Sequence, residues 1–233
     1  MRVPALAPVL LLLASSATLV VPGDARAQGI ADREIVDLQF EGNEAFPEKD
    51  LRTAILTDQT QCKSFLFNFP FMICPLTDWG FAHSREYLDE GELPLDVIRL
   101  QLYYRQRGFR EATVDTTVTR DDETARILFQ ISENDPTLIS SIGVEVVGDA
   151  IDSATVLSHL PTAAGDRLDL IALQLGEATV TDQLRRAGYV DAAVLRDYFI
   201  PRDSRQADVV MRVDPGPRVR IGEVRIVGAE DVG

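Results

Sequence analysis

The sequence contains few of the residues that metal sites and catalytic centres require. Its 233 residues include only two cysteines and two histidines. A structural zinc site needs four ligands, and neither His83 nor His159 stands at ligand spacing from Cys62 or Cys74. No GxSxG, HExxH or Walker motif occurs in the chain. We therefore expect no catalytic residues, no bound metal and no cofactor, and the sequence does not predict an enzyme.

Positive charge is also scarce. Lys and Arg number 23 against 37 Asp and Glu, which gives a formal net charge of −14. Phosphate backbones and anionic headgroups repel such a chain, so binding of nucleic acid and electrostatic docking on a membrane are disfavoured. Hydrophobic residues make up 45% of the chain, which is enough for the cores of two small domains.

The first 27 residues are typical of an export signal. Arg2 provides a positive n-region, residues 5–21 are mostly apolar, and Ala25-Arg26-Ala27 fits a cleavage site. Cleavage there gives a mature chain that begins at Gln28 and has a net charge of −15, because the removed segment carries +1. The alternative is a retained membrane anchor, although the apolar stretch is near the short limit for a span.

Cys62 and Cys74 are expected to form a local disulfide. An exported protein folds in an oxidising compartment, and this bridge closes a short loop, which stabilises a fold by about 2–3 kcal/mol in the chain-entropy model. A pair of metal-binding or nucleophilic thiols is the alternative, but further metal ligands are lacking.

Two kinds of glycine recur at one spacing. Gly108 and Gly188 each end a predicted helix, and they lie 80 residues apart. Gly148 and Gly228 each end a predicted strand, and they also lie 80 residues apart. Two independent landmarks at the same spacing indicate tandem copies of a small unit. Such arrays usually bind or connect other molecules rather than catalyse reactions.

Residues 32–135 are predicted to form the first unit, in the order β-α-α-β-β. Residues 35–40 predict a strand that ends in a turn at Gly42, and Pro47 begins a short helix. A second helix begins at Pro94 and ends at the left-handed cap Gly108. Its predicted buried stripe and the two strands that follow it are Leu95, Ile98 and Leu102, widened by Val97 and Tyr104, and residues 112–119 and 125–132.

Residues 57–93 interrupt this first unit as an insert that also carries the cysteines. One interpretation is a disulfide-tied hairpin that packs on its own domain. The other is an exposed apolar surface that contacts a partner or a lipid interface. The aromatic residues of the insert are Phe65, Phe67, Phe69, Phe71, Trp79, Phe81 and Tyr87.

Residues 136–215 repeat the order of the first unit. A strand at 142–147 ends at Gly148, a short helix follows Asp152 or Ser153, and a longer helix ends at Gly188. The last two predicted strands cover 191–200 and about 209–213.

Residues 217–233 copy the first strand and turn of the earlier units. A lone strand cannot bury a core. We therefore expect these residues to begin an incomplete third domain of a longer protein.

Together these segments resemble the POTRA repeats of bacterial outer-membrane assembly proteins, the BamA/TamA-like family. The resemblance covers residues 32–233 and is carried by strand-to-turn segments such as Phe40-Glu41-Gly42-Asn43 and by helix-to-strand segments such as Leu184-Arg185-Arg186-Ala187-Gly188-Tyr189. The residues that mark the repeated fold are Gly42, Gly108, Phe109, Gly148, Gly188, Tyr189 and Gly228.

The resemblance implies an α+β fold of tandem modules, each with a small three-stranded sheet and two helices on one face. It also implies a periplasmic location associated with the outer membrane, and a C-terminal outer-membrane β-barrel that this chain lacks. The implied partners are unfolded outer-membrane proteins and periplasmic or lipoprotein accessory subunits. The cysteine-bearing insert departs from the minimal repeat, which puts docking through that segment in doubt.

In this family the second strand of each unit lies at a sheet edge, where an extended partner can add as a further strand. Two alternatives stay open. The chain is then part of a two-partner-secretion or division-type POTRA protein, or it is a structural spacer that binds no unfolded client. The candidate client-binding residues on the two edge strands are Val114, Thr116, Val118, Val194, Arg196 and Tyr198.

Overall fold

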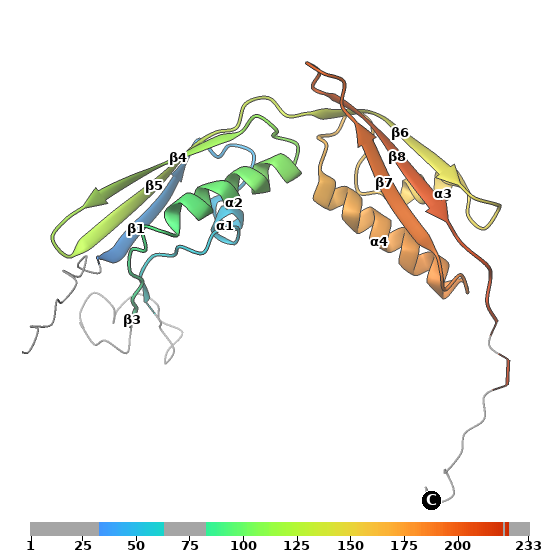
Figure 1. Cartoon of the computed structure of the whole chain (residues 1–233), viewed down its shortest axis with the longest axis horizontal. Coiled ribbons are helices and arrows are strands. Elements are labelled where there is room, and N and C mark those ends of the chain that lie inside the picture. The colour runs from blue at the N-terminus through green and yellow to red at the C-terminus, as the bar shows by residue number, and fades with distance from the viewer. Residues whose placement is uncertain (1–32, 63–82, 221, 224–233) are drawn as a thin grey trace, which may run out of the picture. The chain divides into compact units, whose positions relative to one another are not determined.

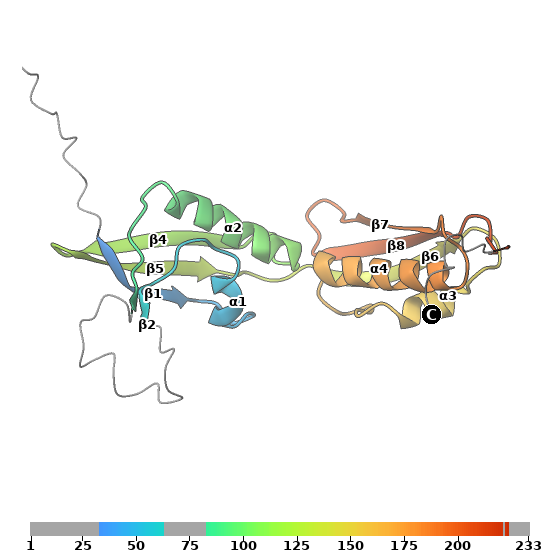
Figure 2. The same ribbon diagram turned by 90° about the horizontal axis from the view of Figure 1, so that it is seen from below.

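A computed structural model describes residues 33–62, 83–220 and 222–223. They form two three-stranded sheets, each with helices on one face (Figures 1 and 2). The predicted α+β class, with its repeated β-α-α-β-β order, is confirmed. The predicted signal peptide, Cys74 and Gly228 lie outside the described residues. Within the described part of the chain, no helix is long and apolar enough to cross a membrane.

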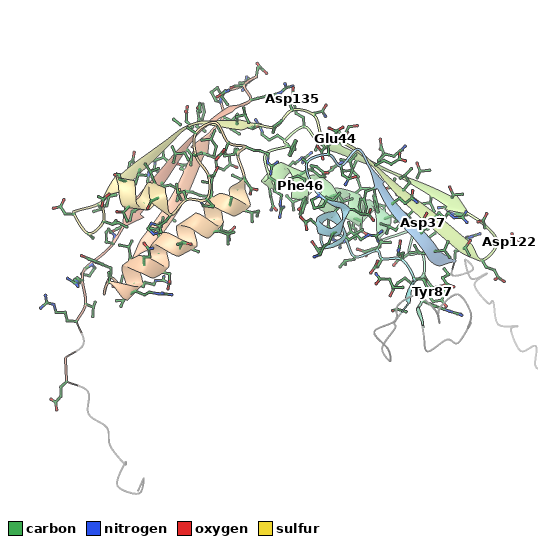
Figure 3. The ribbon with its side chains drawn as sticks, turned by 180° about the vertical axis from the view of Figure 1, so that it is seen from behind. Asp37, Glu44, Phe46, Tyr87, Asp122 and Asp135 are labelled. Atoms are coloured by element: carbon green, nitrogen blue, oxygen red, sulfur yellow. The ribbon has the colours of Figure 1, made fainter. Side chains whose placement is uncertain are left out.

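The first module contains one sheet, two helices and a small hairpin. Strand β1 (Glu34–Glu41) runs parallel to β5 (Thr124–Ser132), which pairs antiparallel with β4 (Thr113–Arg120). Asp122 lies at the tip of the β4–β5 hairpin (Figure 3). The remaining elements are the helices α1 (Glu48–Arg52) and α2 (Leu93–Gln106) and the short strands β2 (Gln61–Cys62) and β3 (His83–Ser84), which pair with each other.

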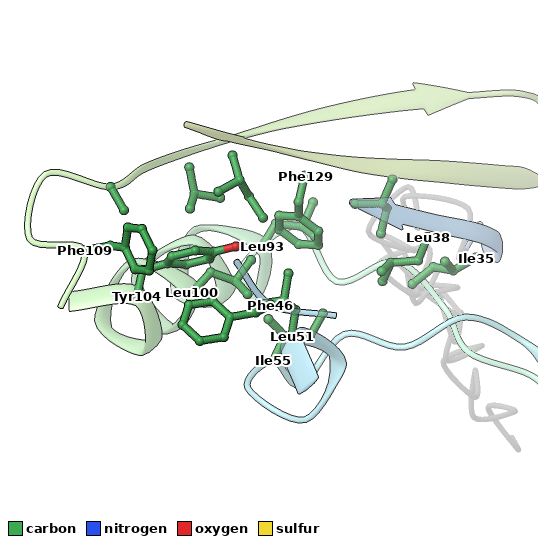
Figure 4. Packing of buried hydrophobic residues seen from close by; sticks show 14 residues of the cluster. Ile35, Leu38, Phe46, Leu51, Ile55, Leu93, Leu100, Tyr104, Phe109 and Phe129 are labelled. Atoms are coloured by element: carbon green, nitrogen blue, oxygen red, sulfur yellow. The ribbon is translucent and has the colours of Figure 1, made fainter. Parts of the chain in front are cut away.

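The core of the first module fills the space between sheet and helices (Figure 4). Aromatic rings form its centre, because Phe46 meets both Tyr104 and Phe109 edge-on, with ring centroids 5.2 and 5.7 Å apart. The Tyr104 hydroxyl donates a hydrogen bond to Glu133 Oε1 at 2.9 Å. Burial raises the pKa of Tyr104, and the same hydrogen bond raises it further. This phenol therefore stays neutral and links α2 to the end of β5.

The predicted buried stripe of α2 is wrong. Leu95, Ile98 and Leu102 are 46%, 59% and 51% exposed. Two interleaved sets of residues on this helix have apolar helical spacing, and the sequence pattern alone does not choose between them. The set that faces the sheet is Leu93, Asp96, Leu100 and Tyr104, with Val97 partly buried beside it.

Asp96 is the polar member of the buried face of α2. Its carboxylate accepts hydrogen bonds from the backbone N–H groups of Leu56 and Thr57 at 2.9 and 3.0 Å, and Arg99 donates a further bond to it. Burial alone raises the pKa of this carboxyl, but these hydrogen bonds outweigh burial and hold its pKa below the usual range. Asp96 thereby fixes the end of α1 and the start of the insert onto α2.

The second module repeats this architecture without the insert. Strand β6 (Leu138–Val146) runs parallel to the central strand β8 (Gln206–Asp214), which pairs antiparallel with β7 (Ala193–Phe199). The helices are α3 (Ser153–Ser158), capped by Asp152, and α4 (Leu170–Arg186), capped by Asp169. The buried core residues from the helices and the central strand are Val156, Leu173, Val180, Leu184, Val209, Met211 and Val213.

The two long helices end in the same way. Gly108 and Gly188 have φ of +95° and +98°, and the N–H of the next residue, Phe109 or Tyr189, bonds the carbonyl five residues earlier at 3.0 Å. This is the left-handed helix cap that glycine favours. Each cap turns the chain into β4 or β7, so the glycines determine where the two strands begin.

Substituting Gly42 by alanine tests the tightest turn. Gly42 has a φ of +81°, and a Cβ there would lie 2.1 Å from the carbonyl oxygen of Ile131. We expect Gly42→Ala to destabilise the chain by more than about 2 kcal/mol in urea unfolding. Gly148 has a similar φ of +76° with no atom within 4 Å, so Gly148→Ala is the matched control and should cost about 1 kcal/mol. Equal losses would contradict the clash.

Replacing Asp96 tests its buried hydrogen bonds. Asp96→Asn leaves one backbone N–H without an acceptor, so we expect a loss of about 1–3 kcal/mol at pH 7. Because the pKa of Asp96 is lower in the folded chain, its contribution is present above the unfolded pKa of about 3.9 and is lost as the pH falls through the folded value. Urea unfolding at pH 7 and below pH 3 should therefore show the wild-type advantage shrinking. An advantage that stays constant with pH would contradict this account.

Candidate functional site

The outer edge of β1 is covered by the chain itself. The Ile35 N–H donates to the Glu86 carbonyl and the Ile35 carbonyl accepts from the Thr60 N–H, both at 2.8 Å. Further along, the Leu38 N–H donates to the Gln59 side chain at 3.1 Å. These partners flank the small β2–β3 hairpin, so the base of the insert occupies the edge of β1. The sequence did not indicate this, because two-residue strands carry no periodic signal.

The outer edge of β6 is covered in a similar way. The Ile139 N–H donates to Asp166 O and its carbonyl accepts from the Gly165 N–H, both at 2.8 Å. The Leu168 N–H donates to Thr137 O at the same distance. The loop between α3 and α4 therefore pairs with the start of β6. In both modules the first strand is closed to an added strand over these residues.

The other two edges, formed by β4 and β7, are open. Each strand pairs on one side only, with β5 or β8. Within residues 33–62, 83–220 and 222–223, no backbone group from another element bonds the outer side of either strand. An open edge presents a row of unpaired N–H and C=O groups, which is a template for a further strand.

The hairpin geometry identifies which β4 residues point outward. Asp121 N–H donates to Thr124 O at 2.9 Å, which makes this the first hydrogen-bonded pair of the antiparallel ladder. Since bonded and non-bonded pairs alternate, the N–H and C=O groups of Asp115, Thr117 and Thr119 face β5. Those of Val114, Thr116 and Val118 face outward, and the Val118 carbonyl accepts from the Arg120 side chain at 3.4 Å.

Strand β7 follows the same alternation at positions 80 residues later. The Tyr198 N–H donates to the Asp197 carboxylate at 3.0 Å rather than to β8, which places the backbone groups of Val194, Arg196 and Tyr198 on the outer side. The six candidate residues thus share one geometric property. Their backbone groups lie on the open edges of the two sheets.

The side chains of these six residues face the helices. Val114 and Val194 are buried in the two cores, and Tyr198 is 45% exposed. Between each edge strand and its long helix lies an open groove of roughly 400 Å³. A strand added to either edge would place every second side chain in such a groove.

The two grooves differ in chemistry. The groove between β4 and α2 is mainly apolar and is lined by Glu90, Leu93, Pro94, Val97, Val114, Asp115, Thr116 and Val118. The groove between β7 and α4 is mainly polar and is lined by Gln174, Glu177, Ala178, Thr181, Asp182, Arg185, Val194 and Arg196. Arg196 and Glu177 form an ion pair inside it. The sequence prediction included the strand residues and missed the helix residues, which only the packing brings to the edge.

The fold-marking residues lie at turns and caps away from the open edges. Gly42 and Gly148 end β1 and β6 with positive φ, and Phe109 is buried beside its cap. Tyr189 is partly buried against the second core. No group of three or more His, Cys, Asp or Glu residues within the described part of the chain could hold a metal ion. The features that stand out are therefore backbone edges rather than a cluster of reactive side chains.

Comparison with known families gives one match. The sequence profile of the POTRA family, described as "Surface antigen variable number repeat", matches residues 34–134 and 140–216. These two segments contain both sheets and all the helices described above. No curated protein sequence matches the chain.

Several solved structures are similar to the chain. POTRA domains 3–5 of BamA from Haemophilus influenzae match with 17% identity over 86% of this chain and 73% of that one, with a TM-score of 0.45. POTRA domains 1–3 of Omp85 from Anabaena match with 16% identity over 78% and 59%, with a TM-score of 0.37. CdiB from Escherichia coli matches with 11% identity over 83% of this chain, with a TM-score of 0.31, and the chain spans 29% of its length.

Hydrogen exchange of single amides tests the open edges without any ligand. We expect the outward N–H groups of Val114 and Thr116 to exchange at least roughly tenfold faster than the inward groups of Asp115 and Thr117, because only the latter are bonded to β5. The measurement is residue-resolved exchange by NMR. Equal protection of both sets would show that the outer side of β4 is covered and would remove it as a candidate site.

Proposed function

Because the chain belongs to the POTRA family, we propose that it acts in the periplasm as part of an outer-membrane protein assembly or translocation factor. In this proposal, unfolded outer-membrane proteins bind to β4 and β7 by strand addition. Accessory periplasmic or lipoprotein subunits are further partners, and the chain works beside an outer-membrane β-barrel. The predicted export signal supports the location.

One observation carries the proposal. Each sheet has two edges; the chain covers the edges of β1 and β6 with its own loops, whereas β4 and β7 stay open. The open edges offer backbone N–H and C=O groups, and these make little demand on the sequence of a partner. A binding site for many different unfolded chains needs this property. Side-chain pockets alone would restrict the range of clients.

The number of available bonds also suits a transient interaction. Three outward residues on each strand can offer about six hydrogen bonds, and each contributes a net ~0.5–1.5 kcal/mol. Association itself costs about 4–15 kcal/mol in lost freedom, so backbone pairing alone gives weak, reversible binding. A factor that receives and releases unfolded chains requires such reversibility. The side chains in the grooves then adjust the affinity for particular segments.

Proline at an outward position should remove client binding while the fold is retained. Pro lacks the N–H that an added strand needs, and it is tolerated at a sheet edge. We expect the double variant Thr116→Pro/Arg196→Pro to weaken binding of an extended ten-residue barrel-strand peptide roughly tenfold or more. Fluorescence anisotropy with the full chain measures the affinity, and circular dichroism checks the fold.

The matched control is Thr116→Val/Arg196→Val, which removes the same side chains and keeps both N–H groups. We expect it to bind the peptide within about threefold of the wild type, since β-branched residues fit a strand. Normal binding by a folded proline variant would refute strand addition and leave the spacer role. Equal loss in both double variants would assign binding to the side chains.

A further inference from the structure

We propose that the two open edges bind opposite faces of an alternating client strand. At β4 the apolar face of the client would lie toward the helix, and at β7 it would lie away from it. This inference rests on the proposed function and adds a specificity to it. It concerns clients whose apolar and polar residues alternate, as they do in outer-membrane barrel strands.

The first observation is the contrast between the two grooves. Beside β4, apolar side chains such as Leu93, Val97 and Val118 line the groove. Beside β7, the groove holds the ion pair of Arg196 with Glu177 and the charged Asp182 and Arg185. Placing apolar client side chains over charged groups forfeits hydration of those groups without a compensating bond. The β7 groove therefore favours the polar face of a client.

The second observation is the contrast between the outer sheet faces, which point away from the helices. On β4 this face carries the exposed polar residues Asp115, Thr117 and Thr119. On β7 it carries Leu195 and Phe199, which are 63% and 66% exposed. Neighbouring side chains on one sheet face interact across strands. An added strand would thus place apolar residues beside Leu195 and Phe199, but polar residues beside Asp115 and Thr119.

The 80-residue repeat makes these contrasts directly comparable. Asp115 corresponds to Leu195, and Thr119 corresponds to Phe199, with the polar residue on β4 and the apolar one on β7. On the helix side the exchange runs the other way, from Thr116 in the apolar groove to Arg196 in the charged one. Both faces of the strand are reversed between the modules, so two separate sets of contacts favour the same assignment.

The consequence follows from the period of a strand. Side chains alternate between the two faces, so presenting the other face requires a slip of one residue or a reversal of strand direction. A given client segment cannot then pass from β4 to β7 in the same register and direction. Either two different segments occupy the two edges, or the segment shifts as it moves between them.

Paramagnetic broadening in NMR spectra can test this assignment. The probe is a ten-residue peptide of alternating Val and Thr with a nitroxide on one central cysteine, on either the Val face or the Thr face. Each edge is observed alone in the full chain, with β7 blocked by Arg196→Pro or β4 blocked by Thr116→Pro. At β4 we expect the Val-face label to broaden α2 amides more strongly, and at β7 we expect the Thr-face label to broaden α4 amides more strongly.

A matched pair of substitutions provides a second readout. Leu195→Asp should weaken binding of the unlabelled peptide at β7 roughly fivefold, because an apolar cross-strand contact is lost. Thr117→Asp alters an outer position of β4 that faces the polar side of the client, so it should change binding at β4 less than about twofold. These sites are exposed, so the fold should survive both changes.

The outcomes separate the inference from the function on which it rests. The same client face toward the helix at both edges would overturn the inference and leave strand addition intact. Insensitivity of β7 to Leu195→Asp would also overturn it. No binding of the peptide at either edge would overturn the proposed function, and the inference with it.

Discussion

The need to pair backbone groups at sheet edges determines how this chain is built. A three-stranded open sheet has two edges, and each exposes a row of N–H and C=O groups. Both modules treat the two edges differently: their own loops bond β1 at Ile35 and β6 at Ile139, whereas β4 and β7 receive no such partner within the described residues. The covering segments are unrelated, since one is the base of an insert and the other a loop between helices. The same asymmetry arises in two ways, which ties it to the architecture rather than to one local sequence.

The caps of the long helices place the open strands. Gly108 and Gly188 adopt positive φ and reverse the chain directly into β4 and β7. Their carbonyls accept hydrogen bonds from the N–H groups of Thr137 and Val219, both at 2.8 Å, in the segments that follow each module. One glycine thus ends a helix, starts an edge strand and anchors the next stretch of chain. This shared role explains why the glycine spacing was the clearest repeat in the sequence.

Sequence reasoning succeeded where a local physical rule decides the structure. The glycine caps, the turn at Asp121 and the alternating core residues of β5 and β8 each follow from one residue type or one period. It failed on the buried face of α2, because two sets of apolar residues have helical spacing. The deciding residue is Asp96, whose burial depends on N–H groups 40 residues away in sequence. It also missed the helix side of both grooves, since residues such as Val97 and Glu177 reach the edge only through packing.

Duplication supplies a control inside the molecule. Buried positions such as Val114 and Val194 are identical and keep the sheet in place, so the two edges share a backbone geometry. The exposed positions around them have diverged in polarity, from Asp115 to Leu195 and from Thr116 to Arg196. Packing restricts the first kind of position, whereas solvent-facing positions are free to vary at little cost in stability. A reversal of polarity on both faces of one strand therefore needs a cause other than folding, and unequal partners at the two edges provide one.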